Sequence, residues 1–336
     1  RVRRLSPFVI EALDLPASAV AAGGGVPADP REQLGTYAPL ATPPRERPTE
    51  PIEGRLTLSH SSIDAYLTCP KKYQYAQVLR VPTAPHHSLV YGSALHQAIQ
   101  EFHRAETRGQ IMSEAELDAV LDRSWTNVGF VSREHELARL AAARAALRTF
   151  RTGQLAAGAV VPAWIEREFT FSMGGNRIRG RFDRVDIVTH LAEANGDQGI
   201  PVPQRRSAPN TAMADVIEPS FELLGREEVT ITDYKSSDVP DPVKARRRAR
   251  ESLQLQIYAM AYEALTGRLP DALQLHFLDS ATVGRTAVEP GRLAAARTRI
   301  ESAADGIRAR DYTARPDTMA CTYCPYREIC PSSAAR

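Results

Sequence analysis

No run of apolar residues in this 336-residue chain approaches the roughly 18 to 20 that a membrane-spanning helix needs. No basic segment followed by an apolar one opens the chain, as a secretory signal would. An excess of charge is also lacking, because 42 Lys and Arg against 40 Asp and Glu leave a net charge of +2. Any surface for nucleic acid must therefore be local. With 43% apolar residues, we expect a globular cytoplasmic protein with one large domain or two smaller ones.

Cysteine is scarce, and its placement is uneven. Cys69 stands alone near the start, whereas Cys321, Cys324 and Cys330 lie together in CTYCPYREIC. In a reducing compartment such a set favours metal binding over disulfides. Four thiolates suit zinc or an iron–sulfur cluster, and the spacing does not decide between them. Free buried thiols are the less favoured alternative.

The first part of the chain reads as two segments before the compact domain. Residues 1–15, RVRRLSPFVIEALDL, have the pattern of a short amphipathic helix. Residues 16–54 contain GGG and many prolines, which predicts a linker. We expect the start to be the tail of a preceding domain and residues 55–336 to form the compact domain. The chain begins with Arg1 rather than methionine, which suggests a piece of a longer polypeptide.

Four helices are predicted in the first half of the domain. A serine at 59, 61 or 62 can cap the first helix, which should end before Pro70. Apolar residues at helical spacing predict a second helix over 88–106, which carries His96. A capping-box pattern opens a third helix, and an alanine-rich stretch over 134–150 predicts a fourth.

The pattern changes to strands near residue 160. WIEREFTFSM alternates apolar and polar residues, and Gly-Gly separates it from a second strand segment, RIRGRFDRVDIVTH. Residues 192–227 are polar and aperiodic, which predicts a flexible insertion. EVTITDYK is then a strand, residues 244–267 one long helix, LQLHFLDS a strand and residues 290–309 a final helix. The predicted fold class is α/β.

Two of the predicted strands carry carboxylates. Asp183 lies in GRFDRVD, and Asp233 lies in ITDYKSS two residues before Lys235. Residues i and i+2 of a strand share a face, so Asp233 and Lys235 should enter one site. Carboxylates that hold Mg²⁺ or Mn²⁺, with a lysine as a compact cation beside them, are suited to hydrolysis of a phosphodiester. We expect Asp186 to have a structural role, paired with Arg184 or Arg181.

The segments GSALHQAIQEF, IEREFTF, GRFDRVD, ITDYKSS and QLQIYAMA resemble, in order and character, the RecB-like branch of the PD-(D/E)XK nuclease superfamily. The resemblance runs from about Leu56 to Pro331. It implies a central mixed sheet flanked by helices, with a helical N-terminal part. Cys69 and the C-terminal cysteines resemble the iron–sulfur staple of AddB-type members. Residues 1–15 resemble the tail of a UvrD-like helicase domain, which implies an actinobacterial helicase–nuclease subunit of the AdnAB kind.

The resemblance also implies roles for individual residues. His96, Asp183 and Asp233 would bind the Mg²⁺ or Mn²⁺ ion, and Lys235 would position or activate the attacking water. Glu168 would be an auxiliary acid, although Glu166 has the same strand parity. The remaining implied residues are Gln254 and Tyr258, which would contact DNA or order the site, and Cys69, Cys321, Cys324 and Cys330, which would hold a structural 4Fe–4S cluster.

A basic run opens the long helix predicted after Lys235. Its cationic residues are Lys244, Arg246, Arg247, Arg248 and Arg250. A solvated helix face is the simple interpretation of such a run. Next to a metal and carboxylate site, contact with DNA phosphates becomes at least as favoured.

Three functions follow. The first is a metal-dependent DNA nuclease, with exonuclease activity on single-stranded ends, in a helicase–nuclease complex for repair and recombination. Its partners would be a helicase domain in the same polypeptide and a second helicase–nuclease subunit, although this chain contains no G-x-x-x-x-G-K-[ST] motif. The second is a stand-alone iron–sulfur exonuclease of the CRISPR-adaptation type. The third is a catalytically silent DNA-binding module.

Overall fold

The computed structural model describes residues 11, 50–156, 158, 160–190 and 226–335. The chain divides into two compact units, Arg1–Thr49 and Glu50–Arg336, and the second is the one described below. Apart from residue 11, the predicted tail at 1–15 lies outside the described residues, and so does the body of the predicted insertion. Arg226 and Glu227, at the predicted end of the insertion, already belong to a strand. No helix in the described part of the chain is long and apolar enough to span a membrane.

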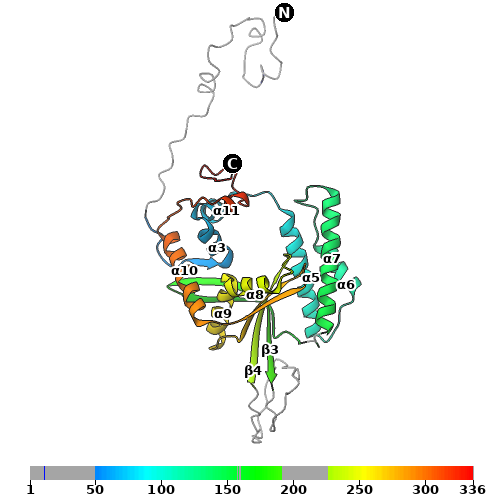
Figure 1. The fold of residues 1–336 in the computed structure, drawn as a ribbon. Helices are drawn as coiled ribbons and strands as arrows, with labels where there is room; N and C mark the ends of the chain where they lie inside the picture. Colours follow the sequence, from blue (N-terminus) through cyan, green and yellow to red (C-terminus); the bar gives the residue numbers. More distant parts are fainter. Residues whose placement is uncertain (1–10, 12–49, 157, 159, 191–225, 336) are drawn as a thin grey trace, which may run out of the picture. The chain divides into compact units, whose positions relative to one another are not determined.

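The second unit contains a six-stranded mixed sheet (Figure 1). Strand order is β1-β3-β4-β5-β6, with β2 paired to β3. Pairs β1–β3 and β4–β5 are parallel, and the others are antiparallel. The strands are β1 (Thr57–Ser59), β2 (Trp164–Met173), β3 (Asn176–His190), β4 (Arg226–Lys235), β5 (Ala272–Phe277) and β6 (Thr282–Ala287). The predicted mixed sheet is confirmed, and β1 and β6 are additions to it.

Nine α-helices and one π-helical segment are described in this unit. They are α3 (His60–Thr68), α4 (Pro70–Tyr73), η2 (Gln74–Val78), α5 (His87–Thr107), α6 (Glu114–Ser124), α7 (Arg133–Ala156), α8 (Pro242–Glu251), α9 (Leu253–Thr266), α10 (Pro290–Arg308) and α11 (Thr318–Thr322). The predicted serine cap of α3 is Ser59, and the predicted capping box of α6 is present at Ser113 and Glu116.

Strand β3 organises the sheet because different strands flank its two halves. Its first half forms a hairpin with β2 across Gly174 and Gly175, which adopt the positive φ angles of 53° and 76° that glycine tolerates. Its second half pairs with β4 from Arg184 onward. Asp183 therefore lies where the β4 pairing begins, next to the strand that carries Asp233.

Two buried clusters cover the two faces of β4. Val229 and Ile231 point into a core shared with α3, α9 and α10. Tyr234 points the other way, into a core formed with α5, α6 and α7, which stand together in Figure 1. Because strand residues alternate between faces, Asp233 lies on the α9 side, opposite to the side chain of Tyr234.

The prediction of one long helix over residues 244–267 is wrong, because the chain forms α8 and α9 with a break at Ser252. Ser252 has an extended ψ of 112°, and its hydroxyl accepts a hydrogen bond from the N–H of Leu255 at 3.3 Å, which caps α9. Helix α8 packs on β5 and β6, where a Cβ at Gly284 would lie 2.1 Å from the carbonyl oxygen of Ala245. Helix α9 packs on β2, β4 and β5 instead.

Candidate active site

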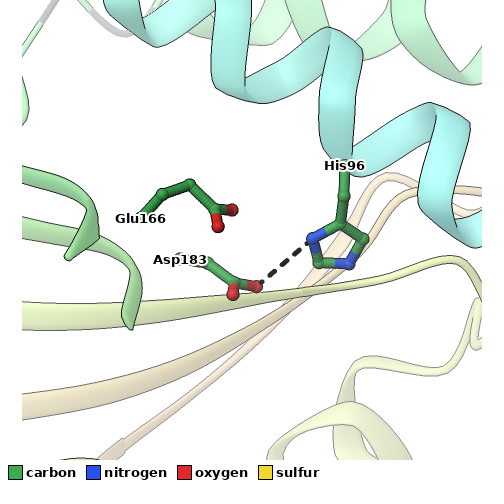
Figure 2. A group of neighbouring side chains, drawn as sticks. All are labelled: His96, Glu166 and Asp183. Atoms are coloured by element: carbon green, nitrogen blue, oxygen red, sulfur yellow. Dashed lines mark ion pairs between the residues drawn. The ribbon is translucent and has the colours of Figure 1, made fainter. Parts of the chain in front are cut away.

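His96, Glu166 and Asp183 meet at one point between α5, β2 and β3. One potential ligand atom from each lies within 4.8 Å of the others, and Figure 2 shows both carboxylates turned toward the imidazole. The distance between His96 Nδ1 and Asp183 Oδ2 is 3.6 Å. Among the described residues, this is the one group of three at that spacing. Asp233, predicted to share the metal, lies outside this group.

The imidazole of His96 presents a lone pair to the carboxylates. Its Nε2 lies 3.1 Å from the carbonyl oxygen of Tyr234, which can only accept, so Nε2 carries the hydrogen and Nδ1 does not. Burial lowers the pKa of His96, which favours this neutral form. A lone pair that faces carboxylate oxygens is stable only with a cation or a proton between them.

A positive charge would also stabilise the carboxylate of Asp183. Its Oδ2 accepts a hydrogen bond from the N–H of Tyr234 at 2.9 Å. Burial and the neighbouring charge of Asp233 nevertheless hold the pKa of Asp183 well above its usual range. A divalent cation would replace the proton that this pKa favours.

Asp233, Lys235, Gln254 and Tyr258 form a closed ring of contacts beside that group. Lys235 Nζ lies 2.7 Å from Asp233 Oδ2 and donates to Gln254 Oε1 at 2.8 Å. Gln254 Nε2 donates to the Tyr258 hydroxyl at 2.8 Å, and that hydroxyl donates to Asp233 Oδ1 at 3.4 Å. Burial and the charge of Asp233 raise the pKa of Tyr258, so its phenol stays a donor. The structure thus brings these four predicted residues together.

The glutamate that joins the group is Glu166, whereas Glu168 lies outside it. Glu166 has a φ of 48° and stands between the β2–β3 register pairs that flank Asp183. Its side chain is only 9% exposed, with Arg181 Nε 2.5 Å from Oε2. Glu168 is exposed, and its backbone partner is Arg181. Strand parity gave both glutamates the same face, and nothing in the sequence indicates the left-handed backbone that turns Glu166 inward.

The donor set fits Mg²⁺ or Mn²⁺. Carboxylate oxygens with one imidazole nitrogen suit these cations, and nitrogen favours acceptance of Mn²⁺. Two buried oxygens each have one cationic neighbour: Arg181 Nε lies 2.5 Å from Glu166 Oε2, and Lys235 Nζ lies 2.7 Å from Asp233 Oδ2. A carboxylate oxygen has two lone pairs, so one remains on each oxygen. Both keep lone pairs for a cation. Burial raises the pKa of Glu166, which a bound cation would oppose.

The five predicted DNA-binding side chains all lie on exposed positions of α8, whose buried residues are Ala245 and Ala249. The Arg248 guanidinium is 5.9 Å from the ring centre of Phe277, which is the Cα partner of Lys235 in the β4–β5 pair. Arg250 instead reaches Glu289, at 4.0 Å. The Arg248 side of α8 is thus the side next to strand β5 and its partner β4.

The structure also brings the four cysteines to one pocket. Cys69, at the end of α3, and Cys321, Cys324 and Cys330, in and after α11, line it together. None forms a disulfide, and Cys69 Sγ accepts a hydrogen bond from the N–H of Arg315 at 3.4 Å. No three of their sulfurs lie within 4.8 Å of one another. A single tetrahedral zinc ion would need sulfurs about 3.8 Å apart, given a Zn–S bond of about 2.3 Å.

Comparison with protein families supports one assignment. A model of the PD-(D/E)XK nuclease superfamily matches residues 57–195 and 211–331, more than half of the chain. The chain belongs to this superfamily. The three-residue pattern in the superfamily's name, an acid, any residue and a lysine, is present as Asp233, Tyr234 and Lys235. The predicted superfamily is therefore confirmed, and so is the α/β core expected for it.

Two solved structures are similar to this PD-(D/E)XK chain. One is a putative exonuclease from Eubacterium rectale, with 11% identity and a TM-score of 0.42 over 76% of this chain and 81% of the other. The second is SSO0001, with 14% identity and a TM-score of 0.33 over 84% of this chain and 90% of the other. No curated protein matches the chain. The assignment rests on the family model alone.

Proposed function

We propose that this chain is a Mg²⁺- or Mn²⁺-dependent deoxyribonuclease. The observation that carries the proposal is the convergence of His96, Glu166 and Asp183 on one point, beside Asp233 and Lys235. A bound divalent cation would polarise the phosphoryl oxygen and lower the pKa of water. Asp233 would be a further ligand, since its buried Oδ2 has a second lone pair besides the one that faces Lys235 Nζ.

Lys235 is the residue that we expect to contact the scissile phosphate or the attacking water. Its ammonium is held by Asp233 and Gln254, and its side chain is 37% exposed, so it can also reach a substrate. Tyr258 holds Gln254 and Asp233 in place. Fixing the lysine before substrate arrives lowers the entropy cost of the reactive geometry.

We further propose that the substrate is a single-stranded DNA end, cut as an exonuclease would cut it. The exposed cations of α8, the helix that follows β4, support a nucleic-acid substrate, and the single-stranded end is what the resemblance to the RecB-like branch implies. Phosphate binding by such a row needs no base contacts. The proposal includes a cytoplasmic location and a role in a helicase–nuclease complex that processes double-strand ends, as the resemblance to the RecB-like branch implies.

The cysteine pocket supports a structural 4Fe–4S cluster as part of the same proposal. All four thiols line one pocket, and four thiolates are the ligand set of a 4Fe–4S cluster. The ligands come from the two ends of the domain, so the cluster would close a very long loop. This role is stabilising and involves no step of phosphodiester hydrolysis.

The test is cleavage of 5′- and 3′-labelled single-stranded DNA with Mg²⁺ or Mn²⁺. We expect Asp233→Ala and the size-matched Asp233→Asn to reduce cleavage more than about 100-fold, beyond the range for residues that only orient a ligand. Asp238→Ala, an exposed aspartate just after β4, is the control and should cleave normally. Unchanged cleavage by Asp233→Ala would show that the site is misplaced. A wild-type protein that binds DNA without cutting it would indicate the silent module instead.

A further inference from the structure

The backbone of one residue holds two members of the metal group. The N–H of Tyr234 donates to Asp183 Oδ2 at 2.9 Å, and its carbonyl oxygen accepts from His96 Nε2 at 3.1 Å. Both the carboxylate and the imidazole are thus oriented by residue 234. Whatever fixes this short piece of β4 also fixes the spacing between His96 and Asp183.

The side chain of Tyr234 is anchored on the other face of the strand. It is 2% exposed, and its hydroxyl lies 2.8 Å from His103 Nε2. His103, which is 1% exposed, lies one heptad after His96 on α5, and its Nδ1 is 2.6 Å from Glu106 Oε2. Helix α5 therefore contacts residue 234 twice, through its backbone by His96 and through its side chain by His103.

The position of Arg184 indicates which group donates in the Tyr234–His103 and His103–Glu106 hydrogen bonds. Its guanidinium, which can only donate, has one nitrogen 3.3 Å from His103 Nε2. Nε2 must therefore carry the lone pair. The hydrogen is then on Nδ1 and is donated to Glu106. The Tyr234 hydroxyl, which itself accepts from Arg184, donates to Nε2 and shares the single lone pair of that nitrogen with the guanidinium. Burial raises the pKa of Glu106 to about 7, so its carboxylate is ionised at pH 8 and can accept.

Arg184 is itself held firmly in place. Asp186 accepts from its Nε at 2.8 and 2.9 Å, Gln154 accepts at 2.7 Å, and the carbonyl of Val160 accepts at 3.0 Å. The predicted structural role of Asp186 as a partner of Arg184 is confirmed. Because Arg184 directly follows Asp183, the network ties β3 as well as α5 to Tyr234.

We infer that Tyr234 is a positioning residue of the metal site, whose hydroxyl, bonded to the His103–Glu106 pair, fixes the backbone that orients Asp183 and His96. The inference rests on the proposed function at one point: the cation that this site binds is taken to be the cation that DNA cleavage requires. Tyr234 is the middle residue of the Asp233–Lys235 motif. Its side chain lies on the face of β4 opposite to Asp233 and Lys235, and the inference gives it a positioning role. The inference also explains why four polar side chains are buried behind the site rather than replaced by apolar ones.

The test is Mn²⁺ binding to the full chain at pH 8, by calorimetry, with Tyr234→Phe. This change removes one oxygen and keeps the ring, which stacks on His103 at 5.9 Å. We expect Mn²⁺ affinity to fall about 10- to 100-fold, and the Mn²⁺ concentration for half-maximal cleavage to rise by the same factor. At saturating Mn²⁺, kcat should stay within a few-fold of the wild type.

Tyr66→Phe is the matched control. Its hydroxyl is also a buried donor, to the carbonyl of Asp311 at 2.8 Å, and it lies in the other core. Both variants should lose a similar small amount of Tm, whereas only Tyr234→Phe should lose Mn²⁺ affinity. If Tyr234→Phe proves unfolded, Glu106→Gln provides the same test with a smaller expected loss, about two- to five-fold, because the amide can still accept from Nδ1–H.

The outcomes separate this inference from the proposed function. Equal Mn²⁺ affinity in Tyr234→Phe and wild type, with a lowered Tm, would make the network merely structural and overturn the inference. Weakened Mn²⁺ binding in a protein that cuts no DNA would uphold the positioning role and refute the nuclease. Absence of Mn²⁺ binding by the wild type would overturn both.

Discussion

The candidate active site and the cysteine pocket both collect side chains that are far apart in the sequence, but the fold holds them differently. In the candidate active site, strand register and a closed ring of hydrogen bonds fix the side chains without the help of an ion. In the pocket, three cysteines lie in or after α11, which buries none of its residues. From Thr318 onward, Tyr326 is the one buried apolar side chain of the described residues.

A bound metal would therefore contribute differently in the candidate active site and in the cysteine pocket. The sheet would keep the carboxylates together without metal, so the ion adds chemistry to a site that is already formed. The C-terminal segment buries little apolar surface, because Met319, Tyr323 and Ile329 are exposed, so ligation by the cysteines would supply its stability. The following predictions test this contrast, from the largest expected effect to the smallest.

The largest effect should come from Cys324→Ser. Loss of one ligand should remove the proposed cluster and with it the tie between the two ends of the domain. A tie that closes so long a loop restricts the unfolded chain, and its loss should lower the free energy of unfolding by about 5 kcal/mol. Absorbance near 400 nm, iron content and Tm should all decrease together. Asp233→Asn should keep the absorbance, which makes it the control. A colourless wild-type protein that contains zinc would contradict this prediction.

Next in size is the contrast between Glu166→Gln and Glu168→Gln. Glu166 faces the metal group and Glu168 faces solvent, so the first change should reduce cleavage about 10- to 100-fold and the second less than about two-fold. Initial rates at fixed Mn²⁺ would measure both. Equal losses would mean that the left-handed backbone at Glu166 does not determine which glutamate acts.

A smaller effect concerns the dependence of stability on pH without metal. The pKa of Asp183 is raised above its unfolded value of 3.8, so the folded state binds the proton more tightly. Stability should therefore fall as pH rises from about 4 through this raised pKa, by up to about 1.4 kcal/mol per pKa unit. Asp183→Asn should flatten the curve of unfolding free energy against pH. A parallel curve for wild type and variant would argue against a strained carboxylate.

The smallest effect should be in DNA binding by α8. Arg248 lies on the side next to Lys235, whereas Arg250 is near Glu289. Arg248→Ala should lower the slope of log Kd against log salt by about 0.7 for single-stranded DNA, which corresponds to one phosphate contact. Arg250→Ala should change the slope less. Fluorescence anisotropy at several salt concentrations would distinguish them, and the reverse order would place DNA on the other side of α8.

Much of the fold was predictable because its signals are local. Caps and apolar spacing indicated α3, α5 and α6, and period-two alternation indicated β2. The break at Ser252 was missed because both flanking segments have helical composition, and the break follows from packing α8 on β6 and α9 on β2 and β4. Strand β6 was missed because its short sequence, TVGRTA, carries little periodicity.

By itself, the sequence determined the superfamily motif and the shared face of Asp233 and Lys235, since residues two apart on a strand project together. Only the tertiary structure decided which glutamate joins His96 and Asp183, because a left-handed backbone at Glu166 is imposed by its surroundings. The tertiary structure also decided that Tyr234 is anchored through His103, because contacts across more than a hundred residues depend on how α5 packs against β4.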